Sequence, residues 1–284
     1  MSTRRMIFGP RGWYPAQRGR CEAMIAAFTH DRPRAERLPE PIVAAIVPHA
    51  GWRFSGRTAW AAIAALPDAD VVVLFGNDHG GRARRPALIA EGAWETPFGE
   101  VQVDAEFAGR LLEAKVAAMD ERAHQEEHSI EIQMPLVAKR FPDARVVPIL
   151  VPHTDDAKRL GETAARLAGE GGRRVVVIGT TDLTHYGDNY GFAPAGDGPA
   201  ALPWMKKNDA SIIEVMRRLA VDEVYAEVEA KGNACGAGPI VATLAYAKAR
   251  GSAGGVAVHY TTSADESPDR GGPFLAVGYV GMLF

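Results

Sequence analysis

The stretch VVVLFGNDHGG, from Val71 to Gly81, begins with five apolar residues in a row and then turns polar and glycine-rich. A second stretch of the same kind, RVVVIGTTDLTHYG, runs from Arg174 to Gly187. Continuous runs rich in Val and Ile are typical of strands covered on both faces, whereas strands with one wet face alternate. The two stretches therefore predict a sheet that is buried between two layers of helices.

Similar apolar runs recur along the chain, and amphipathic stretches separate them. The predicted strands are Pro41–Val47, Asp70–Phe75, Ala87–Ala90, Arg145–Val151, Arg173–Ile178, Gly255–Tyr260 and Phe274–Met282. The predicted helices are Gln17–Phe28, Ser55–Ala65, Ala105–Lys115, His128–Arg140, Asp155–Gly169, Met205–Leu219 and Gly236–Arg250. This alternation predicts an α/β sandwich, one domain over residues 1–284, with a central mixed, largely parallel sheet flanked by helices.

Two regions depart from the alternation. The last two strands, with a Gly/Pro-containing turn between them, are expected to add antiparallel strands to the sheet. The segment Tyr186–Pro203 holds so much Gly and Pro that it predicts a long surface loop, and such loops are often functional.

Composition excludes several classes of protein. The 284 residues carry a formal net charge of −3, which argues against a general nucleic-acid binder. No apolar run approaches the roughly 20 residues that cross a bilayer. Because the N-terminus also lacks the apolar core of a signal peptide, we expect a cytoplasmic protein with neither nucleic acid nor membrane as a partner.

Polar side chains follow four of the predicted strands. They are His49 after AAIV, Asp78 and His79 after VVVLF, His153 after VVPIL, and Asp182 and His185 after VVVIG. If these strands are parallel, such residues meet at the carboxyl edge of the sheet, where α/β proteins bind ligands. A turn or capping role can explain one such histidine. It is a weaker explanation when several of the chain's eight histidines follow strands in the same way. Neighbouring glycines permit the close backbone approach that a cleft requires.

The stretch KGNACGAGPI places Cys235 in a turn that leads into a helix. The helix dipole and free N–H groups there are expected to lower the pKa of the thiol and favour a thiolate, which is a metal ligand or a nucleophile. A small buried hydrophobe is the alternative. Cys21, in the helix QRGRCEAMIAAF, is expected to be such a core residue.

The other histidines give weaker indications. His128 and Glu131 lie three apart on one face of the predicted helix, as an imidazole–carboxylate pair or as a local interaction at the helix start. Asp182 and His185 are also three apart; Asp182 is expected to orient the imidazole, ligate a metal or accept a proton, unless this is only a turn. By their neighbours, His30 and His124 are expected at the surface, and His259 within a strand as a structural residue.

Several well-known catalytic motifs are absent. The sequence has no P-loop, no H-E-x-x-H helix, no paired C-x-x-C, no G-x-G-x-x-G after the first strand and no G-x-S-x-G elbow. The remaining set of His, Cys and Asp suits a transition metal such as Fe(II), Zn(II) or Cu.

Seven motifs, taken together, resemble the Memo family, called AmmeMemoRadiSam system protein B in bacteria and archaea. They run in order along nearly the whole chain: GWYPAQ, PHAGWRFSG, GNDHGG, EEHSIEIQMPL, GTTDLTHYG, CGAGPI and HYTTSAD. The resemblance implies a fold like that of class III extradiol dioxygenases, which use non-haem iron. It also implies that His49, His79 and Cys235 ligate a metal.

The same resemblance assigns further residues of the cleft. His185 stands where the related dioxygenases keep an acid–base histidine, Asp182 is a further cleft residue, and His128 matches a histidine near that cleft. Those dioxygenases carry a glutamate where this family has the cysteine, so ring cleavage is not implied. His153 matches no signature of the family, and we expect it to be structural or peripheral.

Two functions follow as expectations. The first is a non-haem Fe(II) oxygenase that acts with O2 on a small aromatic or phenolic substrate, with His185, Asp182 and His128 as catalytic residues. The second is a non-catalytic protein that binds a metal, including Cu or Zn, or a partner; it would serve metal or redox handling, or a radical SAM system.

Overall fold

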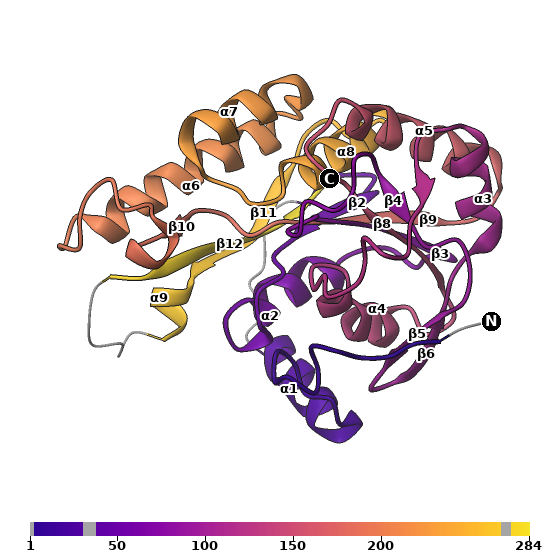
Figure 1. Cartoon of the computed structure of the whole chain (residues 1–284), viewed down its shortest axis with the longest axis horizontal. Coiled ribbons are helices and arrows are strands. Elements are labelled where there is room, and N and C mark those ends of the chain that lie inside the picture. The colour runs from indigo at the N-terminus through magenta and orange to yellow at the C-terminus, as the bar shows by residue number, and fades with distance from the viewer. Residues whose placement is uncertain (1–2, 31–37, 268–273) are drawn as a thin grey trace.

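A mixed β-sheet lies between two layers of helices (Figure 1). The computed structural model describes residues 3–30, 38–267 and 274–284. Over those residues the main sheet has nine strands, and a separate sheet has three. None of the helices in the described ranges has the length and apolar character of a membrane-spanning segment.

Four parallel strands form the centre of the main sheet. All four are almost completely buried, as the continuous apolar runs predict. Val73 pairs with Val177 on one side and with Val147 on the other. In spatial order the strands are β2 (Ala44–Val47), β9 (Val175–Thr180), β3 (Val71–Gly76) and β8 (Arg145–Leu150).

The strands that flank this centre are mostly antiparallel to their neighbours. Beside β2 lies the long strand β12 (Ala276–Leu283), which pairs with β11 (Val256–Thr262) and β10 (His185–Tyr186). Beside β8 lies β4 (Ala87–Leu88), followed by β7 (Ala118–Met119). The mixed sheet and the antiparallel C-terminal strands are as predicted, with the parallel pairing concentrated in the four central strands.

Helices cover both faces of the sheet. One face carries α1 (Arg18–His30), α2 (Trp52–Ile63) and α4 (Met134–Arg140), which share one apolar cluster. The other face carries α3 (Ala105–Glu113), α5 (Asp156–Glu170), α6 (Ala201–Arg217), α7 (Val224–Lys231) and α8 (Ala237–Ala249). The short α9 (Ser263–Glu266) precedes the last strand, and three 3-10 turns cover Glu131–Gln133, Asp188–Tyr190 and Val221–Glu223.

Several elements differ from the sequence-based expectation. The small sheet of β1 (Thr3–Arg4), β5 (Ala93–Thr96) and β6 (Gly99–Gln102), and the helix α7, had no clear periodicity to predict them. The predicted helix from His128 begins only with a 3-10 turn at Glu131. The predicted loop of residues 186–203 is irregular over most of its length. It holds the 3-10 turn Asp188–Tyr190, and its last three residues, 201–203, already form the start of α6.

The expectation that His124 lies at the surface is wrong. Its side chain is buried, and Nε2 donates to the carbonyl oxygen of Ala87 at 2.9 Å. Polar neighbours in the sequence suggested exposure, but the turn folds this imidazole inwards. His259 and Cys21 behave as expected, since His259 Nδ1 lies 2.7 Å from the hydroxyl of Thr58 and Cys21 is fully buried. The side chain of His30 lies outside the described part of the structure.

His124→Gln tests this burial through the pH dependence of stability. Burial lowers the pKa of His124 to about 4, whereas an unfolded histidine has a pKa of about 6.5. The unfolded chain therefore binds more protons as the pH falls, and the native state loses about 2 kcal/mol between pH 7 and 5 through this group. Urea denaturation at both pH values should show a smaller loss in His124→Gln, by about that amount.

The matched control for this prediction is His153→Gln. The side chain of His153 is half exposed, so this variant should lose as much stability on acidification as the wild-type protein. Equal losses in His124→Gln and wild type would contradict the prediction.

Candidate functional site

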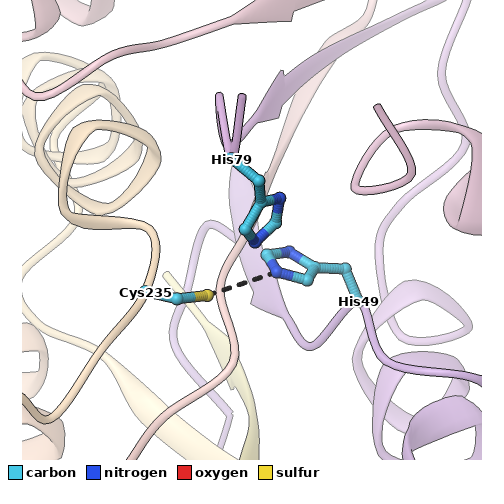
Figure 2. Close-up of side chains that lie close together, drawn as sticks. All are labelled: His49, His79 and Cys235. Atoms are coloured by element: carbon cyan, nitrogen blue, oxygen red, sulfur yellow. Dashed lines mark hydrogen bonds between the residues drawn. The ribbon is translucent and has the colours of Figure 1, made fainter. Parts of the chain in front are cut away.

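Three potential metal ligands meet at the carboxyl edge of the sheet. His49 follows β2, His79 follows β3, and Cys235 lies two residues before α8. Figure 2 shows the three side chains pointing toward one another, and their ligand atoms all lie within 4.8 Å of one another. The structure thus brings together the three residues that the motifs single out as ligands.

His49 is the most deeply held of the three. Its backbone N–H donates to Oδ1 of Asp182 at 2.8 Å, and its Nδ1 lies 3.0 Å from the hydroxyl of Thr180. Thr180 is the last residue of β9, the neighbouring parallel strand, and Asp182 follows two residues later. These contacts direct Nε2 toward Cys235, whose Sγ lies 3.3 Å away (Figure 2).

Cys235 reaches the site because its neighbour is a glycine. A Cβ at Gly236 would lie only 2.7 Å from the carbonyl oxygen of Thr180, so a larger residue would force α8 away from β9. The backbone N–H of Asp182 donates to Sγ at 3.3 Å. The close approach that the glycine-rich sequence predicted is therefore what positions the thiol.

The shift of the Cys235 pKa has the opposite direction from the one expected. Burial and, after it, the carboxylate of Asp182 raise the pKa of the Cys235 thiol far above its usual range. These effects outweigh the lowering of the pKa by the N–H groups near the helix start. Burial likewise raises the pKa of Asp182.

Glu127, which the sequence analysis did not single out, fixes His79. Its carboxylate accepts from the backbone N–H of His79 at 2.9 Å and lies 3.0 Å from Nδ1 of the same residue. The N–H of Ser129 also donates to it, at 2.8 Å. Burial opposes its charge, but the His79 hydrogen bonds and nearby imidazoles prevail and lower the pKa of Glu127 to about 2. An ionised carboxylate only accepts hydrogen bonds, so Nδ1 of His79 is the donor and Nε2 takes no part in this contact.

His128 stacks on His79 but does not pair with Glu131. The two imidazole rings are 4.4 Å apart at 18°, and Trp13 covers His128 at 4.8 Å. Burial, followed by the neighbouring His79, lowers the pKa of His128 to about 4, so this ring is neutral at pH 7.

The carboxylate of Glu131 turns away from this cluster. It accepts from the backbone N–H groups of Ile7 and Phe8 and from the hydroxyl of Tyr14. The predicted pair is wrong because His128 precedes the helical turn, so the two residues do not share a helix face.

His185 is oriented by the backbone rather than by Asp182. Its Nδ1 lies 3.0 Å from the carbonyl oxygen of Leu183, and Tyr190 packs edge-on against its ring. Since a carbonyl only accepts, Nδ1 is the donor in this contact and Nε2 takes no part in it. The expected orienting role of Asp182 falls instead on His49, whose N–H its carboxylate accepts.

Two other residues from strand ends lie outside the cluster. Asp78 accepts from the backbone N–H groups of Arg82 and Ala83 and so closes its own turn. His153 stacks on Tyr225 with ring centroids 3.8 Å apart, and its Nε2 lies 3.5 Å from Glu229. The peripheral place expected for His153 agrees with these contacts.

A cavity of about 590 Å³ opens beside the cluster, within the size range of small-molecule sites. His49, His79, His128, Asp182 and His185 all line it. Aromatic side chains form much of the remaining wall: Trp13, Phe54, Tyr190 and Tyr279.

The fold and the site define a mixed α/β protein with a candidate metal centre at the carboxyl edge of its sheet. The family described as "Memo-like protein" matches residues 11–283, and the chain belongs to the Memo family. The resemblance carried by the seven motifs is thereby confirmed.

Relatives of the chain extend over most of its length. A "MEMO1 family protein" of Methanococcoides burtonii is 37% identical over 254 residues, 87% of this chain and 88% of the relative. One from Archaeoglobus fulgidus is 33% identical over 277 residues, 96% of each chain. The crystal structure of the uncharacterized protein JW3007 from Escherichia coli K12 shares the fold, with a TM-score of 0.53 and 15% identity. That likeness covers 85% of this chain and 99% of the other.

Proposed function

We propose that this protein binds a transition metal ion, Fe(II) in the first place, and oxidises a small aromatic or phenolic molecule with O2. The observation that carries the proposal is the cluster of His49, His79 and Cys235, of which His49 and His79 line the cavity. Two imidazoles and one thiol are donors that Fe(II), Zn(II) and Cu accept, and three protein ligands leave positions open.

The orientation of the rings supports this set of ligands. An imidazole nitrogen binds a metal along its lone pair, which lies in the plane of the ring. The rings of His49 and His79 are almost perpendicular, at 87°, with centroids 5.0 Å apart, so their planes intersect and one ion can lie in both.

A second trio, His79, Glu127 and His128, also brings its ligand atoms within 4.8 Å of one another. The stacked rings of His79 and His128 lie in nearly parallel planes, so one ion cannot lie in both. The ring geometry therefore favours the trio that includes Cys235. Glu127 then acts on His79 as the carboxylate that orients a ligating histidine.

The cavity residues supply the remaining groups. Such a metal provides Lewis-acid and redox chemistry when bound. Nδ1 of His185 is committed to a backbone carbonyl, so Nε2 is the nitrogen with which this side chain can take a proton from a phenolic hydroxyl in the cavity and return it. His128 is a second neutral imidazole of the same wall. Asp182 holds the backbone of His49 in place.

A second candidate function is metal handling without turnover. The observation that favours it is the thiol itself, because a soft sulfur ligand beside imidazole suits Cu and Zn as well as iron. In that case the cavity would admit a partner or a small ligand without oxidising it.

Ligand substitutions test the metal site. Protein produced and purified without oxygen should contain about one metal ion per chain by elemental analysis. Each of His49→Ala, His79→Ala and Cys235→Ser removes one donor and should lose most of that metal. The matched control is His153→Ala, which removes an exposed histidine at another strand end and should keep it. Full occupancy in all three ligand variants would contradict the assignment.

Glu127→Gln tests the orienting carboxylate. The variant keeps the shape of the side chain but removes its charge, so we expect metal affinity to fall roughly 10- to 100-fold in competition with a chromogenic chelator. Glu126→Gln, a change at the exposed neighbouring residue, should leave the affinity unchanged. Equal affinity in Glu127→Gln and wild type would show that Glu127 has no such role.

Oxygen uptake separates the two functions. Protein loaded anaerobically with Fe(II) should consume O2 in an oxygen electrode when members of a panel of phenols and catechols are added. His185→Ala removes the proton acceptor, so uptake should fall about 100-fold or more while the iron content stays unchanged. Absence of uptake with the whole panel, together with tight retention of Cu or Zn, would support metal handling instead.

A further inference from the structure

The charges that line the cavity are unbalanced. Arg11 and Arg53 both contribute to its wall, and both side chains are exposed. Asp182 is the one carboxylate among the described residues that line the cavity. Its side chain is buried and accepts from the N–H of His49, so it is committed to the backbone beside the candidate metal site. The described wall therefore carries an excess of positive charge.

Neither arginine makes an ion pair with a carboxylate among the described residues. Arg53 donates weakly to the neutral hydroxyl of Ser267 at 3.4 Å, and its guanidinium carbon lies 5.7 Å from the ring of Phe54. The guanidinium carbon of Arg11 lies 5.5 Å from the ring of Phe8.

Other arginines of the protein form ion pairs with carboxylates. Arg174 lies 2.6 Å from Asp70, and Arg173 lies 2.7 Å from Asp104. The aromatic contacts of Arg11 and Arg53 support these side chains without neutralising them, which leaves their N–H groups available to a ligand.

The rest of the wall suits a flat, apolar body. Trp13, Phe54 and Tyr279 present rings to the cavity, and Leu275 and Val277 add aliphatic surface. Such walls stack on or enclose an aromatic ring, while a few polar groups fix its orientation.

We propose that the ligand of this cavity is an aromatic compound with an anionic substituent, a carboxylate, which Arg53 and Arg11 bind. The inference rests on the proposed function in taking this cavity as the substrate site. The planar guanidinium group matches a carboxylate with two parallel hydrogen bonds, which selects for charge and shape together. The ring of the ligand then lies toward His128 and His185, the imidazoles of the same cavity.

The test uses the 284-residue chain without added metal and two probes of nearly equal shape, 4-hydroxybenzoate and its neutral analogue 4-hydroxybenzamide. Isothermal titration at low ionic strength should show that the benzoate binds about tenfold more tightly, because charge-assisted hydrogen bonds are the stronger kind. This advantage should shrink as salt is added, since the arginines are exposed.

Substitutions locate the source of the preference. Arg53→Gln and Arg11→Gln should each reduce the affinity for the benzoate, and the double variant should bind both probes equally. The affinity for the benzamide should stay at the wild-type value throughout, which shows that the cavity is intact. Arg84→Gln removes an exposed arginine that is not among the residues lining this cavity and should change neither affinity.

The outcomes test this inference and the proposed function separately. Equal affinities in the wild-type protein, binding of neither probe, or a preference that persists in the double variant would each overturn the inference, whatever the metal content. If the ligand variants keep their metal but the arginine variants lose the preference, the metal assignment fails and the carboxylate site stands.

Discussion

The site depends on the register of the four parallel strands, which makes them end at the same level. Val47 at the end of β2 pairs with Thr180 at the end of β9, and Gly76 at the end of β3 pairs with Leu150 at the end of β8. Because the strands end together, the residues that follow them emerge at one edge. A one-residue slip would turn the neighbouring side chains to the opposite face of the sheet, so the buried apolar faces that fix the register also fix the site.

Cys235, the third candidate ligand of the site, comes from a distant part of the chain. Cys235 belongs to a turn that enters α8, and this helix packs directly on the ends of β9 and β8. A Cβ at Gly238 would lie 2.3 Å from the carbonyl oxygen of Val151, just as one at Gly236 would collide with that of Thr180. Two glycines, two residues apart at the start of the helix, thus let it approach both the end of β9 and the residue that follows β8. The thiol is held where it is by backbone packing as much as by its own hydrogen bonds.

The sequence allowed the sheet, most helices and several site residues to be predicted, because each of these leaves a local pattern. His49, His79 and Asp182 could be placed because they follow buried strands, and Cys235 because a glycine-rich helix start follows it. Glu127 left no such pattern: it lies in an irregular turn, and its partner His79 is 48 residues away. Only its place directly before His128, in the run EEH, could have drawn attention to it.

The errors share a physical cause, which is that burial depth cannot be read from neighbours in the sequence. His124 has charged neighbours but a buried side chain, and Glu131 binds backbone N–H groups more than 120 residues away. The thiol of Cys235 is the clearest case. A helix N-terminus contributes on the order of 0.3 to 1 kcal/mol to a nearby anion, which is less than the cost of burying an unpaired charge.

The same burial acts in opposite ways on the two kinds of ligand. Burial and the neighbouring imidazoles His128 and His79 lower the pKa of His49, so this ring is already in the neutral form that a metal requires. Burial and Asp182 raise the pKa of Cys235, so the thiol is not in the deprotonated form that a metal requires. A thiolate in this position is stable only beside a compensating positive charge, and the neutral ring of His49 does not provide one. Burial therefore favours a neutral His49 and an uncharged Cys235, and a metal cation bound between them would stabilise the thiolate that burial alone disfavours.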